Sequence, residues 1–439
     1  MALNPAIIKS VEQLGYRVTV GDVAAQAGLD VNLAQQGLLA LASDAGANLQ
    51  VAESGDIAYV FPSNFQGILR NKYLRLQLQE WWQKVWNVLF YLIRISFGIL
   101  LILSIILIFL AIFLIIIALN SANENDSGGN DSRRSGGGML FFPRSWYWSD
   151  IFWLFNPGYS RTDYSRRQAR SQSSGEQNEL NFLEAIFSFL FGDGNPNFNL
   201  EERRWQAIGQ VIRNNGGAIA AQQIAPYLDE IDAIALEEES YILPILSRFN
   251  GYPEVSPQGE IIYYFPELQV TAQEQGQISE LTEFLPESPY RFSAAGSGQI
   301  MGAIALGSVN LIGALTLWSL MQGDIALQIG GLVAFVASIY WLLLGYGIAF
   351  FAVPLIRYFW IQQKNSTIQQ RNEERIQRAE TLRQADESLL QKLDYARQFA
   401  RERIIGEEDL SYSTETDLID QELANIEQGD REWQKRLES

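Results

Sequence analysis

The sequence predicts a mixed α+β membrane protein, mainly α, with two winged-helix-like domains, transmembrane helices and a long C-terminal helix. Three observations lead to this fold class. Residues 95–119 form an apolar run without a charge, residues 292–323 and 325–356 form two more, and one helix-and-hairpin pattern occurs at both 1–65 and 200–270. A hydrocarbon core about 30 Å thick needs roughly 20 apolar residues as helix, so each run is long enough to span it.

The first domain, 1–65, is predicted from three helices followed by a hairpin. Apolar spacing indicates helices at 4–14 and 31–43, and between them Thr19 and Asp22 have the spacing of a capping box. The third helix offers four leucines to a core: Leu33, Leu38, Leu39 and Leu41. Two strands follow, at 48–53 and 57–62. Three helices and a hairpin in this order are the winged-helix arrangement, a relative of the helix-turn-helix.

The second domain, 200–270, is predicted as an internal repeat of the first. Residues 51–62 read VAESGDIAYVFP and residues 255–266 read VSPQGEIIYYFP, with Val, Gly, Ile, Tyr, Phe and Pro identical at an offset of 204 residues. An offset of 201 residues aligns the first helices, so one three-residue insertion reconciles both. The aromatic residues expected to supply the cores of the two hairpins are Tyr59, Phe61, Tyr263 and Phe265.

The charge balance disfavours nucleic acid as a partner. Lys and Arg number 32 against 50 Asp and Glu, a formal net charge of −18. Residues 31–43, which correspond to the DNA-recognition helix of a winged helix, contain no Lys or Arg. Groove binding without neutralisation of phosphates has little to hold it. The two domains are therefore interpreted as protein-interaction modules.

The composition also excludes most catalytic chemistry. The chain has no cysteine and no histidine, which removes thiolate and imidazole metal sites, cysteine nucleophiles and Ser-His-Asp hydrolysis. The acidic run 229–239 is interpreted as a solvated face. Asp193 begins an EF-hand-like spacing, but Phe198 stands where that loop needs glycine and Arg204 where it needs glutamate. We therefore assign no catalytic, cofactor-binding or metal-binding residue and predict that the protein is not an enzyme.

The flanks of the first apolar run predict how it meets the membrane. Residues 71–94 form a basic amphipathic interfacial helix rich in tryptophan, in which Arg94 is expected to reach toward the lipid headgroups. Residues 95–119 either span or re-enter. Residues 120–180 are a Gly/Ser/Asn-rich linker with an aromatic patch at 139–159 that is expected to lie on the membrane surface. A short apolar helix and turn follow at 181–199.

The remaining apolar runs predict a helical hairpin turned near Gly323, followed by cytoplasmic elements. Small residues one turn apart, such as Gly298 and Gly302, indicate close helix packing, and Asn310 is expected to hydrogen-bond across that interface. Residues 357–405 have the apolar spacing of a long amphipathic helix that forms a coiled coil or docks a partner. An acidic tail, 406–439, ends the chain.

Three stretches resemble a family of uncharacterised membrane proteins of cyanobacteria and plastids. They are FLEAIFSFLFGDGNPN at 182–197, ERRWQAIGQVIRNNGGAIAAQQIAPYLD at 202–229 and SPQGEIIYYFP at 256–266. The resemblance implies a plasma or thylakoid membrane. Some plant members carry an iron–sulfur cluster biosynthesis label, but this chain lacks the cysteine and histidine that usually ligate a cluster.

Together these features predict a non-enzymatic integral membrane scaffold or assembly protein that docks protein partners at a lipid membrane. A membrane-tethered winged-helix DNA-binding regulator is the alternative, and a transporter or enzyme-complex subunit is less favoured. A homo-oligomer stays open. Basic residues before the first run and after the last favour the cytoplasm for both domains and the C-terminal helix. That arrangement makes residues 85–119 a re-entrant hairpin, whereas one long spanning helix puts 120–297 on the far side.

Overall fold

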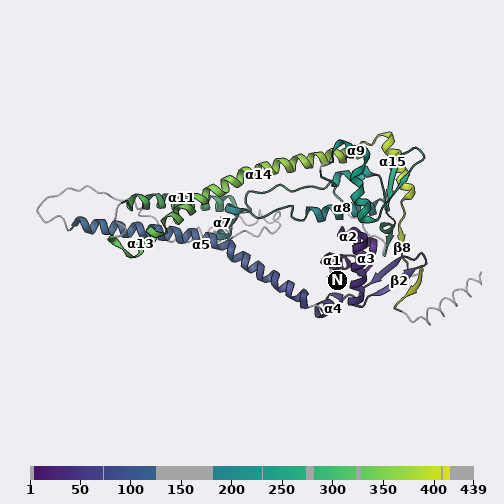
Figure 1. Ribbon diagram of the computed structural model, residues 1–439, viewed down its shortest axis with the longest axis horizontal. Coiled ribbons are helices and arrows are strands. Elements are labelled where there is room, and N and C mark those ends of the chain that lie inside the picture. The colour runs from purple at the N-terminus through teal and green to yellow at the C-terminus, as the bar shows by residue number, and fades with distance from the viewer. Residues whose placement is uncertain are drawn as a thin grey trace, which may run out of the picture. The chain divides into compact units, whose positions relative to one another are not determined.

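A computed structural model describes residues 4–72, 74–124, 181–229, 231–272, 281–322, 328–406 and 409–415 (Figure 1). The chain is mixed α/β and mainly helical, and it divides into two compact units. Unit 1 comprises Met1–Glu80, Pro196–Pro289 and Ser366–Ser439, and unit 2 comprises Trp81–Asn195 and Tyr290–Asn365. Unit 1 therefore takes chain from three separate parts of the sequence.

The first half of unit 1 has the three helices and the hairpin predicted for it, and two further elements, β1 and α4. In order they are α1 (Pro5–Gln13), β1 (Arg17–Thr19), α2 (Val20–Ala27), α3 (Val31–Ala45), β2 (Asn48–Ala52), β3 (Ile57–Val60) and α4 (Phe65–Lys72). The predicted capping box is present: the Asp22 N–H donates to Thr19 Oγ1 at 3.1 Å, and the Thr19 N–H donates to Asp22 Oδ2 at 2.8 Å. Leu38 and Leu41 are buried as predicted, whereas the prediction for Leu33 and Leu39 is wrong, because both lie on the solvent side of α3.

The second half contains a similar order of elements, with shorter helices. They are α8 (Leu200–Asn214), β4 (Ala218–Ile219), η1 (Ala221–Gln223), η2 (Ala225–Tyr227), α9 (Ala233–Glu238), η3 (Ser240–Ile242), α10 (Leu243–Phe249), β5 (Tyr252–Val255), β6 (Ile261–Tyr264), η4 (Pro266–Gln269) and β7 (Val270–Thr271). Where the first half has α2, this half has 3₁₀ turns. Pro226 lies in them and has no N–H to donate to an α-helical bond.

The two hairpins have the same register. Leu49 pairs with Tyr59 in the first and Pro253 with Tyr263 in the second, and the strand orders are β1-β3-β2 and β4-β6-β5. Each hairpin turns at a glycine with positive φ, Gly55 at 88° and Gly259 at 91°. The predicted core aromatics Tyr59, Phe61, Tyr263 and Phe265 are all buried.

The two halves share one hydrophobic core, built where α2 packs against α8. The helices approach closely because Gly209 faces the backbone of Ala25, where an added Cβ would lie 2.8 Å from the Ala25 Cα. Arg248 donates to the Gly28 carbonyl at 2.9 and 2.7 Å. Unit 1 is thus one folded body and not two separate modules.

The C-terminal segment of the chain completes unit 1. α15 (Glu387–Phe399) packs against β4 and β6, β8 (Arg403–Ile404) runs parallel to β7, and β9 (Leu410–Ser413) adds to the edge of β2. The prediction of one helix over 357–405 is wrong, because the helix breaks before Asp386, whose side chain caps α15, and Ile404 is in a strand. Leu389 and Ala396 on α15 are buried, so the apolar side of this helix packs on β4 and β6 of the same chain.

Among its described residues, unit 2 contains three helices long and apolar enough to cross a membrane. These helices are α5 (Leu74–Glu124), α11 (Ser297–Leu320) and α14 (Tyr340–Arg383). Two shorter helices, α7 (Phe182–Phe191) and α13 (Gly331–Ser338), also belong to unit 2. α5 is one continuous helix, so the re-entrant hairpin is wrong: with Gly98 as its one glycine, the run has no turn chemistry to reverse it. The predicted helix 325–356 is interrupted at Ile339, and α14 runs through the predicted boundary at 356.

α11 lies alongside α5, and the two helices share a hydrophobic core (Figure 1). As predicted, Asn310 hydrogen-bonds across the helix interface: its Oδ1 accepts from Ser104 Oγ at 2.7 Å. Gly307 lies against the ring of Phe350 and Gly302 against Phe182, whereas Gly298 has open space around it.

Several predictions fall outside the described residues. They are the linker 120–180 beyond residue 124, its aromatic patch at 139–159, the turn at Gly323 and the acidic tail 406–439 beyond residue 415.

Candidate functional site

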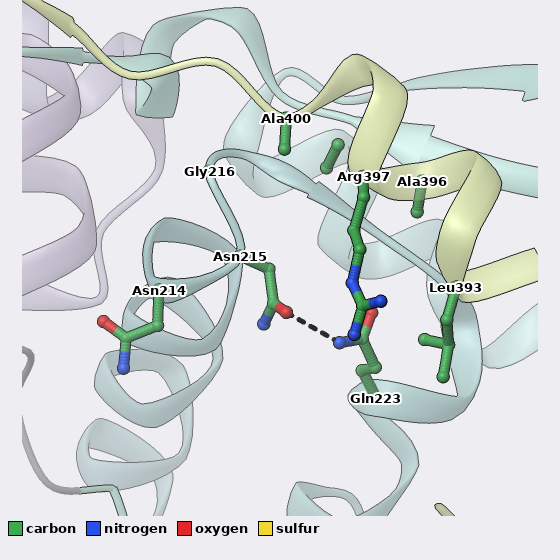
Figure 2. A pocket seen from close by; sticks show the side chains of 9 residues that line it. Asn214, Asn215, Gly216, Gln223, Leu393, Ala396, Arg397 and Ala400 are labelled. Carbon is green, nitrogen blue, oxygen red and sulfur yellow. Dashed lines mark hydrogen bonds between the residues drawn. The ribbon is translucent and has the colours of Figure 1, made fainter. Parts of the chain in front are cut away.

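A pocket of about 360 Å³ lies in unit 1 where α8 ends, β4 begins and α15 packs (Figure 2). Amide groups dominate its polar lining, and Gln223 Nε2 donates to Asn215 Oδ1 at 2.8 Å. Arg397 extends toward Gln223 in Figure 2 and forms an exposed ion pair with Asp394 at 2.7 Å. The residues that line the pocket are Asn214, Asn215, Gly216, Ala218, Gln223, Leu393, Ala396, Arg397 and Ala400. These groups can hydrogen-bond a small polar molecule, but none is a nucleophile or a general base at neutral pH.

The strongest electrostatic feature of unit 1 is a buried ion cluster around Arg375, near the end of α14. The Arg375 side chain is fully buried and contacts Glu287 Oε1 at 2.8 Å and the Leu285 carbonyl at 2.9 Å. It also pairs with Asp229, and Arg371 Nε donates to Glu287 Oε1 at 2.8 Å. The cluster joins α14 to the loops that flank the second half, so its geometry is that of a structural clamp.

The protonation state of this cluster is fixed by its arginines. Burial alone would raise the pKa of Glu287, but the hydrogen bond from Arg371 and the charges of Arg375 and Arg371 outweigh it and lower the pKa below 4.5. Burial lowers the pKa of Arg378, although carboxylates around it act in the opposite direction. An ionised Glu287 held by two guanidiniums cannot serve as a proton donor near neutral pH.

The acidic run 229–239 is not the uniformly solvated face that its composition predicts. Asp229 pairs with Arg204 at 2.5 Å as well as with Arg375. Glu239 accepts hydrogen bonds from Gln222 and Tyr263 and pairs with Lys392 of α15. The middle of the run, including Glu237 and Glu238, is exposed as predicted. The prediction fails at both ends because Asp229 and Glu239 have cationic partners outside the run, of which Arg375 and Lys392 lie more than 140 positions later in the chain.

In unit 2, Arg94 does not extend freely toward the headgroups. It forms an ion pair with Asp193 at 2.7 Å, and Asp193 also accepts from Ser188 Oγ at 2.6 Å and the Ala294 N–H at 2.7 Å. Asp193 is therefore used by the protein itself. Among the described residues, no group of three or more His, Cys, Asp or Glu could hold a metal ion. An arginine within an apolar run is a signal to search for its carboxylate, which could have identified this pair.

The exposed residues of α3 carry no charge, in contrast to the acidic chain as a whole. Leu33 is 53% exposed and Leu39 is 48% exposed. The other exposed residues of this helix are Asn32, Gln35, Gln36 and Ser43. Such a face matches an apolar and hydrogen-bonding protein surface and offers no cation to phosphate.

Comparison with known proteins places the chain in a family. An uncharacterised chloroplastic protein of Arabidopsis thaliana is 39% identical over 444 aligned residues, which cover 98% of this chain and 81% of the plant protein. The chain belongs to the family of that protein. The family thus has a plastid member, in agreement with the resemblance noted in the sequence. No family model matches the chain, and no solved structure matches it.

Proposed function

We propose that the protein is a non-enzymatic scaffold or assembly factor of plastid and cyanobacterial membranes, in which unit 1 docks protein partners. The observation that carries this proposal is the α3 face: two half-exposed leucines among neutral polar residues, with no Lys or Arg on the helix. Exposed apolar residues rimmed by polar ones mark protein contacts. A membrane-tethered DNA-binding regulator is disfavoured by the same face, because phosphate contacts supply most of the affinity for DNA.

We infer further that the two halves of unit 1 are winged-helix-like modules related by internal duplication. The matching hairpin registers and the matching glycine turns support this. So does a repeated backbone bond: the Phe61 N–H donates to the Tyr16 carbonyl at 2.8 Å, and the Phe265 N–H donates to the Gly217 carbonyl at 2.8 Å. Fusion of two modules through one core gives a docking platform of fixed geometry. We place this platform on the cytoplasmic face of the membrane.

Site-specific photocrosslinking tests the docking role. A photoreactive amino acid replaces Leu39 on α3, and Ser247 on α10 serves as an exposed control position. We expect the Leu39 probe in native membranes to yield a discrete cross-linked product that the Ser247 probe lacks. The absence of any product specific to Leu39 would contradict docking through α3.

The DNA-binding alternative is tested with the whole protein in detergent micelles, because the two halves share a core and should not be separated. Fluorescence anisotropy with duplex DNA at two salt concentrations gives the measurement. Salt-sensitive binding near physiological ionic strength would favour the regulator.

A further inference from the structure

The sheet of the first half has an edge that accepts a strand. β9 pairs antiparallel with β2, so this sheet has the order β1-β3-β2-β9. The Leu49 N–H donates to Thr414 Oγ1 at 2.8 Å, and the Thr414 N–H returns a bond to the Leu49 carbonyl at 3.0 Å. The Glu53 N–H donates to the Asp409 carbonyl at 2.9 Å. Both ends of the outer edge of β2 are thus engaged.

The corresponding edge of the second half is closed by proline. In the shared hairpin register, Leu49 corresponds to Pro253 and Glu53 to Pro257. Neither proline has an N–H, so two of the donors that bind the added strand in the first half are missing in the second. The Val255 carbonyl between them accepts from Tyr395 Oη at 3.3 Å. The contrast indicates that the outer edge of β2 can pair with an added strand, whereas the outer edge of β5 cannot.

β9 is held by its backbone and by one apolar side chain. Leu410 packs against a small cluster that contains Ala52, Ala58, Ala272, Val270 and Ile405. Tyr412 is 38% exposed, and the pairing register shifts between Val51 and Ala52. A strand with few buried apolar contacts opens at a lower free energy than the core of its domain.

We propose that the outer edge of β2 is a strand-addition site for an extended segment of a partner protein, and that β9 occupies this site in cis until the partner displaces it. The inference rests on the proposed docking function and names the class of ligand. The alanine-lined cluster selects a leucine-sized side chain, and the Leu49 amide selects a hydroxyl four positions later, as Leu410 and Thr414 show. In strand addition the main-chain bonds give affinity and such pockets give specificity.

The tethering of β9 explains why the partner must be a neighbour. A strand linked to its own site competes at an effective concentration in the millimolar range. A free peptide at micromolar concentration therefore does not displace it from the intact protein. A partner already held on the same membrane or on α3 gains a comparable local concentration and can.

The first test measures hydrogen exchange in the full-length protein in detergent micelles. An opened variant, Leu410→Ser combined with Thr414→Pro, loses the apolar anchor and both Thr414 bonds, and Tyr412→Phe is the matched control. We expect the Leu49 and Glu53 amides to exchange at least about tenfold faster in the opened variant only. The Ala52 amide, which donates to the Asp56 carbonyl within the hairpin, should keep its protection. Loss of protection at Ala52 as well would show that β9 is an integral strand and would overturn the proposal.

The second test adds a fluorescent peptide with the sequence DLSYSTE, residues 409–415. We expect it to bind the opened variant at least about tenfold more tightly than the intact protein and to restore protection at Leu49 and Glu53, because the tethered strand no longer competes. A scrambled peptide should not bind. Equal weak binding to both forms would overturn the proposal, and so would exchange of β9 between isotope-labelled copies of the intact protein, because the occupant would then be a second copy.

If the opened variant does not fold, Thr414→Val removes the hydroxyl acceptor alone and the same amides are followed. The photocrosslinking at Leu39 is independent of both measurements. If crosslinking at Leu39 fails but the peptide binds, docking through α3 is contradicted and strand addition is retained. If crosslinking succeeds but the peptide does not bind, strand addition is contradicted and docking through α3 is retained.

Discussion

Arg375 is the residue on which the packing of α14 in unit 1 depends most. Its guanidinium pairs with the buried carboxylate of Glu287 and donates hydrogen bonds to the carbonyls of Leu228 and Leu285. We expect Arg375→Met to destabilise unit 1 by about 3–5 kcal/mol, because it removes one of the two guanidiniums that compensate the buried charge of Glu287.

Arg383→Gln is the matched control, measured by pulse proteolysis in detergent. Arg383 pairs with Glu283, but both side chains are more than half exposed. Exposed pairs contribute at most about 1 kcal/mol, so this variant should resemble the unmodified protein. Equal losses of stability in the two variants would show that burial does not determine how much the Arg375 ion cluster contributes to stability.

Glu287 predicts how the stability of unit 1 depends on pH. Its pKa is lowered in the folded state, so below pH 4.5 the unfolded chain takes up a proton that the folded chain does not. Stability from this group is therefore fully present above pH 4.5 and is lost as the pH falls through the folded pKa. We expect Glu287→Gln to reduce stability at pH 7 and to flatten its decline between about pH 5 and pH 3, followed by circular dichroism of the solubilised protein. An unchanged slope would show that other carboxylates carry the acid sensitivity.

Among the elements, the contact of α2 with α8 decides whether the two halves act as one body. Gly209→Ala places a methyl group 2.8 Å from the Ala25 backbone, which cannot move aside like a side chain. We expect a net loss of stability, although alanine favours a helix by about 1 kcal/mol over glycine. Gly67→Ala in α4 is the control, because no atom lies within 4 Å of its added Cβ, and it should be neutral or stabilising. Thermal unfolding of the two variants should shift in opposite directions.

Local patterns predicted the elements that depend on local physics. The capping box at Thr19, the hairpin at Gly55 and the uncharged spans all follow from spacing within a few residues, and the structure has them. The path of the C-terminal segment was not predicted, because β9 is short and polar and its pairing with β2 joins positions more than 350 residues apart. The Arg375 cluster was not predicted either, because the partners of Arg375 lie far away in the sequence. By its position on an amphipathic helix, Arg375 looks like an ordinary solvent-exposed arginine.

The candidate site was predicted only as a class of surface. The lack of Lys and Arg on α3 predicts that it is not a DNA-recognition helix, but which of its leucines face solvent depends on how the helix packs. Leu38 and Leu39 are neighbours in sequence, yet one is buried and the other exposed. No pattern in the sequence distinguishes the proline-blocked edge of β5 from the occupied edge of β2 until the register of both hairpins is known.

At the scale of the whole molecule, the contacts in unit 2 predict the sidedness of the chain. Leu183 of α7 lies against Gly98, and Asp193 pairs with Arg94, so residue 183 lies at the end where the uncharged part of α5 begins. α11 starts at this end and α14 returns to it, because Arg357 donates to the Ser188 carbonyl at 3.2 Å. We therefore predict that both halves of unit 1 lie on one side of the membrane, as the core that they share also requires.

Single cysteines test this topology without background, because the chain has none of its own. Introduced at Ser43, Ser247 and Ser388, all exposed, they should react with an impermeant maleimide from one and the same side. A cysteine at Gln322, just beyond the far end of α11, should react only from the opposite side. Labelling of positions 43 and 247 from opposite sides would contradict the arrangement.

The three-part composition of unit 1 has a consequence for how the protein is made. Its first 80 residues leave the ribosome long before residues 196–289, and Ser366–Ser439 are synthesised last, after every spanning helix. At about 5–20 residues per second, the interval between the first part and the last is on the order of tens of seconds. During that time the outer edge of β2 and the α8-facing side of α2 have no covering chain. Messages truncated before residue 366 should therefore yield products that are degraded even though their spanning helices are intact.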